Sequence, residues 1–468
     1  MPKKTSLNLS QIEIGTQVVF LPKNPTPKKN LPSGLEVRQA AVEALWLIMQ
    51  SDHVLEDALK ETFSHKHRKN LQPRDRAFVR LIVMTTLRRR GELEHILKSH
   101  LKKELPKKCG YVRQILLSGA AQLLFLQTPP HAAISLAVEQ CKLDRASSYY
   151  DRLVNAVLRR VSEQGKSPYS AEQSIALNIP AYLRDRWSKL YGPHLANQIA
   201  QASLREPLLD ITVKGNPEVW AERLHGSVLP TGSIRLHNVG PVSELMGFSE
   251  GEWWVQDAAA ALPAKLLRKI SGMRVADLCA APGGKTAQLS SYGANVFAID
   301  ISAARLQKLK ENLDRLKLKA NLICADALTW QPAALLDAVL LDAPCSATGT
   351  LRRHPDILFK YNAARLEKDI GIQALLLEHA AKLLRQGGIL VYSTCSLEKE
   401  EGETQIENFL KKFSNFKRDP IAISEIGELS EALTTNGELR TLPCFSFKGG
   451  SEAEGMDGFF AARLQRIS

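Results

Sequence analysis

Apolar residues recur at three- and four-residue spacing in the first third of the chain, from Val37 to about Ser162. The spacing runs through "VRQAAVEALWLIMQ", "RAFVRLIVMTTLRRR", "VRQILLSGAAQLLFLQ" and "YDRLVNAVLRRV", with short polar or Pro-containing breaks between them. Such a stripe lets a helix bury one face against its neighbours. The pattern predicts an all-α bundle domain over residues 35–163.

A different pattern begins at Met273. Short apolar runs, "RVADLCA", "NVFAID", "NLICADA", "DAVLLDA" and "GILVYSTC", alternate there with amphipathic helical stretches. This alternation predicts an α/β domain over residues 252–468, a doubly wound (Rossmann-like) parallel sheet with helices on both faces. Ligands of such sheets bind at the carboxyl ends of the strands.

The remaining segments are less regular. The polar stretch "SEQGKSPYSAEQS" at 162–174 indicates a linker. Mixed helical and strand-like patterns over 175–251 predict a small α+β module that carries no recognisable chemistry. Residues 1–34, with five lysines and several prolines, predict a flexible basic arm.

Charge narrows the choice of partner. Of the 468 residues, 62 are Lys or Arg and 49 are Asp or Glu, a formal net charge of +13 that favours a polyanion such as nucleic acid. The predicted helix at 74–90 supplies Arg74, Arg76 and Arg80 as candidate RNA contacts, because a guanidinium fork binds two phosphate oxygens at once. The alternative is a solvated helix face.

The seven cysteines form no C-x-x-C pair, which suggests neither a zinc site nor a disulfide framework. The N-terminus lacks the apolar run of a secretory signal, and no stretch approaches the ~20 apolar residues that span a bilayer. We therefore expect a cytoplasmic protein with no metal and no membrane partner, and we expect a monomer.

A Gly-rich turn, "CAAPGGKTAQLSS", follows the first strand and opens a helix, where backbone N–H groups can meet a polar cofactor. A nucleotide phosphate loop requires its first Gly at Cys279, and the dinucleotide fingerprint of dehydrogenases is absent. S-adenosylmethionine has no pyrophosphate and needs neither arrangement. It is the cofactor we expect at the turn residues Cys279, Ala280, Ala281, Pro282, Gly283, Gly284 and Lys285.

Three carboxylates at consecutive strand ends support this assignment. Asp300 ends the second strand, where a carboxylate can bind both ribose hydroxyls. Asp326 ends the third strand, near the expected adenine amino group, and Asp342 ends the fourth. Any one of them could instead cap a helix or a surface turn. Together, beside the Gly-rich turn, they predict one cofactor crevice.

Cys345 in "LDAPCSATG" and Cys395 in "VYSTCSLE" both follow predicted strands at this crevice. A thiolate that adds to carbon 6 of cytosine makes carbon 5 nucleophilic enough to take a methyl group; a base then removes the carbon-5 proton and the thiol leaves. Asp342 could serve as the hydrogen-bonding group at N3 of the ring. The residues alone do not rank the two thiols, and each could be a small buried hydrophobe.

The motifs "DLCAAPGGKT", "AIDIS", "CADA", "LLDAPCSATGTLRRHPDI", "YSTCSLEKEE" and "GMDGFFAARL" resemble those of the Sun/Fmu group of RNA cytosine C5-methyltransferases, over roughly residues 253–466. The stretches "RQAAVEALWLIM", "RDRAFVRLIVMTTLRRR" and "YYDRLVNAVLRRV" resemble the NusB-type helical RNA-binding domain. Their combination is similar to bacterial enzymes that methylate 16S ribosomal RNA.

The resemblance implies Cys395 as the nucleophile, Cys345 as the residue that assists product release, and Asp342 as a contact of both cofactor and base. It also implies that Cys279 to Lys285, with Asp300 and Asp326, hold S-adenosylmethionine. Two alternatives stay open: the same reaction on transfer RNA or large-subunit RNA, and a non-catalytic RNA-binding ribosome-assembly protein. The second has no chemical need for either thiol.

Overall fold

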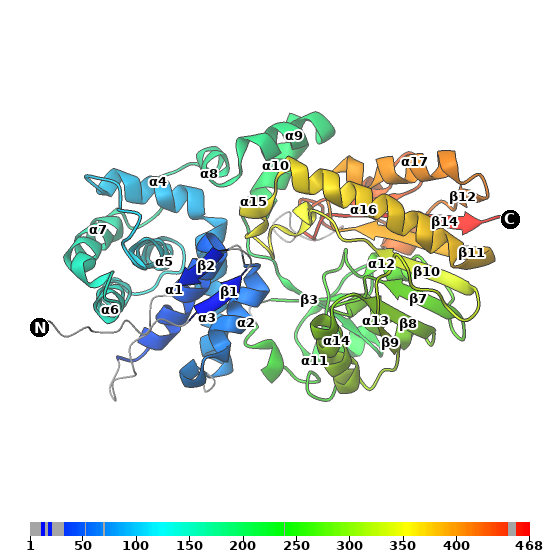
Figure 1. Ribbon diagram of the computed structural model, residues 1–468, viewed down its shortest axis with the longest axis horizontal. Helices are drawn as coiled ribbons and strands as arrows, with labels where there is room; N and C mark the ends of the chain where they lie inside the picture. Colours follow the sequence, from blue (N-terminus) through cyan, green and yellow to red (C-terminus); the bar gives the residue numbers. More distant parts are fainter. Residues whose placement is uncertain are drawn as a thin grey trace, which may run out of the picture. The chain divides into compact units, whose positions relative to one another are not determined.

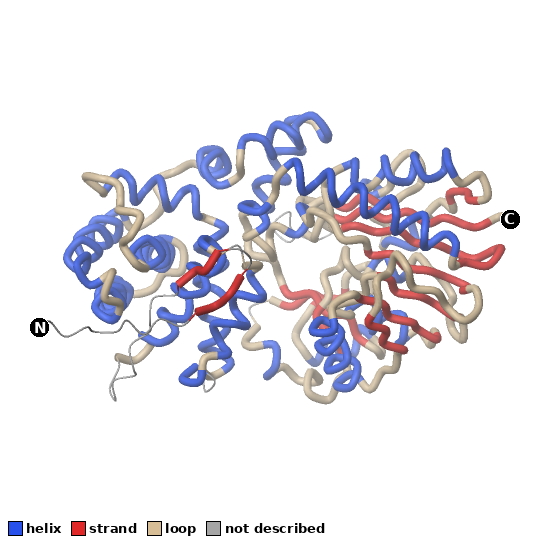
Figure 2. The backbone as a smooth tube through the Cα atoms, viewed as in Figure 1, coloured by secondary structure: helices blue, strands red, loops and turns tan. Residues whose placement is uncertain are grey.

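The computed structural model describes residues 11–14, 17–20, 32–51, 53–68, 71–237, 239–447 and 455–468. The chain forms two compact units, one of residues 1–181 with 354–356 and one of 182–353 with 357–468. Figure 1 labels their helices and strands, and Figure 2 separates helix, strand and loop by colour. Among the described residues, no helix is long and apolar enough to cross a bilayer.

The first unit is a helical bundle, as predicted. Its helices are α1 (Leu35–Gln50), α2 (Leu55–Ser64), α3 (Pro73–Arg88), α4 (Arg90–His100), α5 (Val112–Leu124), α6 (Pro130–Leu143), α7 (Asp151–Gln164) and α8 (Ala171–Asn178), with 3-10 turns η1 (Lys66–Arg68) and η2 (Ser148–Tyr150). Every residue of α5 except Arg113 is buried. A helix buried on all sides needs neighbours all round, and α1, α3, α4, α6 and α7 pack against it.

Local signals place the helix starts. Pro73 and Pro130 open α3 and α6, where a missing N–H has no helical partner to lose. Ser170 and Gln173 form a capping box at α8. Within the predicted basic arm, β1 (Gln11–Ile14) and β2 (Gln17–Phe20) pair as an antiparallel hairpin. The rest of that prediction, up to residue 31, lies outside the described residues.

The second unit begins with the segment expected to be α+β. It contains α9 (Ala181–Tyr191), α10 (Pro193–Ser203), α11 (Pro217–Arg223) and η3 (Val242–Glu244). A four-stranded antiparallel sheet has the order β4 (Ser227–Val228), β5 (Ile234–Leu236), β3 (Leu209–Val213) and β6 (Trp253–Val255). Because β6 pairs with β3, the small sheet extends past residue 251.

The larger sheet has the order β12-β14-β11-β10-β7-β8-β9, with β13 beside β14. Strands β7 to β11 are parallel where they pair, and β14 runs antiparallel to β11. The strands are β7 (Arg274–Leu278), β8 (Asn295–Asp300), β9 (Asn321–Cys324), β10 (Leu336–Asp342), β11 (Leu384–Thr394), β12 (Phe416–Arg418), β13 (Leu439–Thr441) and β14 (Phe459–Arg466). The predicted Rossmann-like fold is confirmed, with an antiparallel addition that makes the sheet mixed.

Helices cover both faces of this sheet. The helices and 3-10 turns in this part of the chain are α12 (Leu262–Lys265), α13 (Gly284–Ser291), α14 (Ala303–Leu316), α15 (Ile357–Lys360), α16 (Ala363–Lys382) and α17 (Glu403–Lys412), with η4 (Thr348–Thr350), η5 (Lys399–Glu401), η6 (Ile423–Ile426) and η7 (Ser430–Ala432). Alternate residues of a strand face opposite sides. In β10, Leu340 packs in the cluster that includes α12 and α13, whereas Leu341 packs in the cluster with α16 and α17. The apolar run "AVLL" is therefore buried on both faces of the sheet.

The strand order also locates the ligand crevice. From β7 the chain proceeds to β8 and β9 on one side, and then returns to place β10 and β11 on the other side of β7. Such a reversal opens a crevice at the carboxyl ends of the strands. The turn after β7 and the loops after β10 and β11 meet at this edge.

Candidate active site

The two thiols singled out in the sequence are neighbours. Cys345 Sγ lies 3.5 Å from Cys395 Sγ, and both are free cysteines. The parallel register explains their meeting, because Asp342 of β10 is paired with Ser393 of β11 and each cysteine follows within three residues. The hydrogen bond to Cys395, followed by burial, raises the pKa of the Cys345 thiol well above its usual value. Cys345 therefore keeps its proton more firmly than an ordinary thiol.

A buried ion pair lies at the same edge. Lys285 Nζ is 2.7 Å from Asp342 Oδ2, and Ser393 Oγ donates to Asp342 Oδ1 at 3.0 Å. Burial lowers the pKa of Lys285, but Asp342 and the other acidic groups nearby together outweigh it and the pKa is raised. Lys285 therefore stays charged, with Nζ 5.1 Å from the centroid of the Phe459 ring. The Lys285 ammonium also interacts electrostatically with Cys395, so a positive charge lies near the two thiols.

The backbone after Cys345 is locked against the C-terminal segment. Gly349 N donates to Cys395 O at 2.9 Å, and Gly458 N donates to Gly349 O at 2.8 Å. A Cβ atom at Gly349 would lie 1.9 Å from Gly458 O, so only glycine fits. The loop that carries Cys345 is thereby fixed to the strand end that carries Cys395.

A single buried carboxylate joins the residues that follow the two cysteines. Glu401, fully buried, accepts hydrogen bonds from Ser346 N at 2.9 Å, from Ser346 Oγ and from Ser396 Oγ. This role was not foreseen from the sequence, because Glu401 belongs to the charged run "LEKEEGE" that looks solvent-exposed. The indication of this role in the sequence was that Glu401 lies close to Cys395 along the chain.

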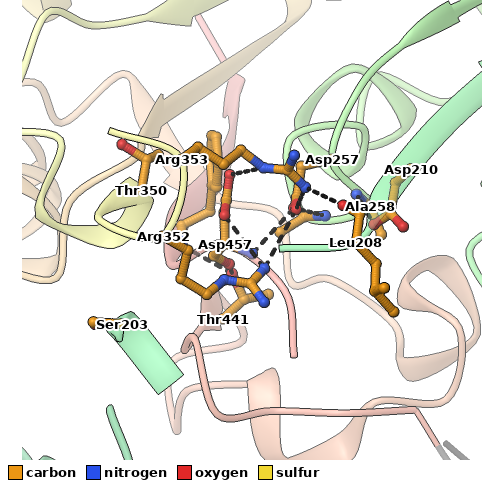
Figure 3. Close-up of polar contacts among 12 residues, drawn as sticks. Ser203, Leu208, Asp210, Asp257, Ala258, Thr350, Arg352, Arg353, Thr441 and Asp457 are labelled. Atoms are coloured by element: carbon orange, nitrogen blue, oxygen red, sulfur yellow. Dashed lines mark hydrogen bonds and ion pairs between the residues drawn. The ribbon is translucent and has the colours of Figure 1, made fainter. Parts of the chain in front are cut away.

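A buried ionic network supports the same loop (Figure 3). Arg353 contacts Asp257 Oδ2 at 2.7 Å and Asp457 Oδ2 at 3.1 Å, and Arg352 Nη2 lies 3.4 Å from Asp457 Oδ1. Although burial opposes ionisation, the two guanidinium groups lower the pKa of Asp257 to about 2. Burial and the charge of Asp257 raise the pKa of Asp457 to about 6. The network ties the segment after β6 and the segment before β14 to the loop after Cys345.

The Gly-rich turn leads directly into a helix and contains two residues in the left-handed backbone conformation. Cys279 has φ 63° and Gly283 has φ 103°, and α13 begins at Gly284. Burial raises the pKa of the Cys279 thiol to about 12, so this thiol is not a ready nucleophile. Asp300 Oδ2 accepts from Ala281 N at 3.1 Å, which fixes the turn to the end of β8.

The remaining predicted cofactor residues differ in how closely they join this turn. Asp300 is 2% exposed and its Oδ2 also lies 3.4 Å from Arg305 Nη1. Asp326 is exposed and accepts from Leu328 N at 2.9 Å, inside its own loop. In the described part of the chain, no hydrogen bond joins Asp326 to the turn. The structure thus brings together the turn, Asp300, Asp342 and the thiols, and leaves Asp326 at the periphery.

The predicted RNA-binding arginines lie on α3 in the first unit. The Arg74 side chain is 83% exposed and lies 3.6 Å from Asp75. Arg80 makes a two-pronged contact with Glu56, at 3.1 and 2.5 Å. Arg76 Nε donates to a backbone carbonyl, and its guanidinium lies 5.3 Å from the Phe63 ring centroid. Arg74 is the most open of the three to a phosphate.

Nowhere among the described residues do three or more His, Cys, Asp or Glu side chains form a cluster that could hold a metal ion. A second buried carboxylate stands behind the turn: Asp277 Oδ2 accepts from Thr286 Oγ1 at 2.6 Å. Burial raises the pKa of Asp277 to about 7. Asp277 helps to hold the first turn of α13 in place.

Comparisons with known proteins agree with this architecture. The family model described as 16S rRNA methyltransferase RsmB/F matches residues 264–465, and the NusB family model matches 35–163. The chain is 34% identical over 450 residues to ribosomal RNA small subunit methyltransferase B of Xylella fastidiosa (strain Temecula1), covering 93% of this chain and 99% of that protein.

A further relative and a solved structure extend the comparison. The protein of the same name from Xanthomonas campestris pv. campestris is 35% identical over 413 residues, covering 85% of this chain and 90% of that protein. The crystal structure of PH0851 has a TM-score of 0.72 at 23% identity and covers 94% of this chain and 100% of that one, which shows a shared fold. The chain therefore belongs to the RsmB/F family of 16S rRNA methyltransferases and carries a domain of the NusB family at its N-terminal side.

Proposed function

We propose that this chain transfers a methyl group from S-adenosylmethionine to carbon 5 of a cytosine in 16S ribosomal RNA, through a covalent bond between Cys395 and carbon 6 of the base. The observation that carries the proposal is the 3.5 Å separation of Cys345 Sγ and Cys395 Sγ beside the Lys285–Asp342 ion pair. Carbon-5 chemistry needs a thiol at such a place, whereas a protein that only binds RNA needs none.

The residues of the turn suit the proposed cofactor. Backbone N–H groups at the start of α13 can receive the cofactor's carboxylate, and the Asp300 carboxylate beside Ala281 can accept from ribose hydroxyls. When bound there, S-adenosylmethionine supplies an electrophilic methyl group. The Cys279–Lys285 turn and Asp300 are the residues we assign to its binding, with Asp326 at the edge.

Asymmetry between the thiols supports Cys395 as the nucleophile. Cys345 keeps its proton and can donate its S–H to Cys395 Sγ at 3.5 Å, which leaves Cys395 as the sulfur that can bond to the base. The Cys395 thiolate forms a bond to carbon 6, and the electron pair of the 5,6 double bond moves to carbon 5, which takes the methyl group. The Lys285 ammonium stabilises the negative charge that develops on the base.

Asp342 is suited to hold the target base. Its carboxylate, oriented by Lys285 and Ser393, can accept a hydrogen bond from the exocyclic amino group of cytosine. The N3 atom needs a donor, and the Lys285 ammonium beside Asp342 has N–H groups to offer. Thus the ion pair can recognise the exocyclic amino group and N3, two of the three polar atoms on this edge of cytosine.

Product release reverses the first bond. The carbon-5 proton passes to a base, its electron pair restores the 5,6 double bond, and the Cys395 sulfur leaves as a thiolate. Cys345, at 3.5 Å, can donate its S–H to the departing sulfur. We assign Cys345 to this step.

The substrate is supported by the two relatives named for small-subunit ribosomal RNA and by the NusB-family domain. The test is to incubate the purified protein with S-adenosylmethionine and, separately, 16S, 23S and transfer RNA, and to map 5-methylcytosine by bisulfite sequencing. We expect a discrete protected cytosine in 16S RNA alone. Protection only in 23S or transfer RNA would reassign the substrate, and methylation at another atom of the base would refute the carbon-5 chemistry.

A further inference from the structure

The helical unit contains a groove that the proposed active site does not use. It is lined by residues of α1, α4, α5 and the segment that joins α4 to α5, and its volume is about 840 Å³. That size is within the range of about 300–1,000 Å³ found for ligand-binding clefts. Its lining combines lysines, apolar side chains and one tryptophan.

The charge on the groove is strongly positive. Lys98, Lys102, Lys103 and Lys107 all line it and all are exposed. The described residues include no ion pair to any of these four. A cluster of unneutralised lysines along one groove binds a polyanion by releasing its counterions.

Acidic residues offset little of this charge. Glu94 also lines the groove, but its Oε1 is already bound to Arg90 Nε at 2.9 Å and to Arg113 Nη2 at 2.8 Å. Glu104 is the other carboxylate in the lining. The Glu94 carboxylate is thus bound by two guanidinium groups, and the groove keeps an excess of positive charge from its lysines.

A buried acceptor without a partner provides an independent sign of a ligand. Gln114 lines the groove and is 2% exposed, yet its Oε1 accepts no hydrogen bond from any described residue. A buried polar atom left unpaired costs about 1–3 kcal/mol. A donor on a bound molecule, such as a base amino group or a ribose 2′-hydroxyl, would satisfy it.

An aromatic surface completes the groove. Trp46 on α1 lines it, is only partly buried, and is held edge-on by Tyr111 with ring centroids 6.3 Å apart. Aromatic faces stack unpaired bases, each contributing about 1–3 kcal/mol. The groove thus has the parts of a site for single-stranded RNA. It offers lysines to the phosphates, an aromatic ring to a base, and a hydrogen-bond acceptor to a sugar or base donor.

We propose that this groove binds a single-stranded segment of the substrate RNA, with the four lysines on its phosphates, Trp46 against a base and Gln114 accepting from a sugar or base. The identity of the RNA rests on the proposed function; the groove's preference for single strands does not. The site is separate from the Arg74 face of α3 considered above.

The first test replaces Lys98, Lys102, Lys103 and Lys107 by Gln in the full chain. Binding is measured by fluorescence anisotropy with a 16S RNA fragment and with an unrelated single-stranded RNA, at several salt concentrations. We expect affinity to fall at least tenfold and the slope of log Kd against log salt to decrease by about 0.7 for each lysine that contacts a phosphate. Cofactor affinity and melting temperature serve as checks of folding.

A matched control carries four other exposed lysines of the same unit changed to Gln: Lys60, Lys66, Lys142 and Lys166. Both variants lose the same formal charge. Equal losses of affinity in the two variants would show a general charge effect and overturn the groove, and so would an unchanged salt slope in the first variant.

The second test uses Gln114→Leu, which removes the unpaired acceptor and leaves the charges intact. We expect RNA affinity to fall several-fold with the salt slope unchanged and the melting temperature equal or higher. Unchanged affinity would overturn the assignment of Gln114. An acidic peptide that competes for the groove while single-stranded RNA does not would make the occupant a protein segment and refute the proposal.

The failure of the proposed function can be told apart from failure of the groove. RNA binding is measured without S-adenosylmethionine and can be repeated on a Cys395→Ala background, so absence of methylation does not affect it. If the protein methylates another RNA and the lysine variant still loses affinity and salt slope, the groove stands and only its substrate changes.

Discussion

Cys345 Sγ lies 3.5 Å from Cys395 Sγ, although the two residues belong to different loops. The two sulfurs are in direct contact but are not bonded, because the S–S bond of a disulfide is about 2.05 Å long. The contact lets one sulfur donate its proton to the other. The proposed division of labour between bond formation and bond breaking depends on this contact.

Removal of each thiol should therefore give opposite results. Cys395→Ala cannot form the adduct, so we expect methylation at background and no protein–RNA band on a denaturing gel. Cys345→Ala should attack and methylate but release product slowly, leaving a protease-sensitive band with labelled RNA. A band with Cys395→Ala alone would reverse the roles. Intact methylation in both variants would make both cysteines structural.

Asp300→Ala should weaken S-adenosylmethionine binding by about 1.5–3 kcal/mol, or roughly 10- to 150-fold, through lost hydrogen bonds to a charged group. The variant also loses the acceptor for Ala281 N, which fixes the turn. Titration calorimetry measures cofactor affinity, and RNA affinity should be nearly unchanged. Asp326→Ala, at the exposed edge, is the comparison and should lose less. Equal cofactor affinity in wild type and Asp300→Ala would refute the assignment.

The contact of Gly349 with Gly458 should tolerate no side chain. Gly349→Ala forces a Cβ atom to within 1.9 Å of Gly458 O, so we expect a lower free energy of unfolding and lost methylation. Gly371→Ala is the matched control: Gly371 lies inside α16, where an added Cβ atom would meet no other atom within 4 Å, and the change should stabilise by about 0.5–1 kcal/mol. Similar stability of the two variants in chemical denaturation would contradict the contact.

Asp277 should make stability depend on pH. Its folded-state pKa is raised from 3.8 to about 7 by burial, so the folded protein binds the proton more tightly than the unfolded chain. This contribution is complete below about pH 4 and is lost as pH rises through 7. Asp277→Asn should match wild type near pH 4 and exceed it at pH 8 by on the order of 2–4 kcal/mol.

Asp337 provides the control of opposite sign. The hydrogen bond from Arg385 holds the pKa of Asp337 below its usual value, so its contribution is present above pH 3.8 and is lost as pH falls. Asp337→Asn should therefore be less stable than wild type at pH 7. If Asp277→Asn and wild type had the same free energy of unfolding at pH 8, the Asp277 carboxyl would not be held in a raised-pKa environment.

Among the α3 arginines, Arg74→Gln should reduce RNA affinity more than Arg80→Gln. Arg74 is 83% exposed, whereas the charge of Arg80 is opposed by Glu56. Filter binding across a salt series measures the RNA affinity of both variants. For Arg74→Gln, the slope of log Kd against log salt should decrease by nearly the amount expected for one phosphate contact. If neither variant changes the slope, this face of α3 does not contact RNA.

The sequence by itself determined the order of elements and the family. Helical spacing and alternating apolar runs identify the bundle and the parallel strands because these periods are properties of local backbone geometry. The Gly-rich turn and the strand-end positions of Asp300, Asp342, Cys345 and Cys395 could be located in the same way. Strand-end placement predicts a common edge, because the carboxyl ends of parallel strands meet there.

The tertiary structure decided which of those residues touch, and which apparently exposed charges are buried. The register between β10 and β11 sets the 3.5 Å contact of the thiols, and no local pattern encodes a register between strands more than 40 residues apart. Burial of Glu401 likewise depends on α16, β11 and the Cys345 loop closing around it. A charge in a polar run looks solvent-exposed in sequence, because burial and partner choice arise from segments that meet only in the folded chain.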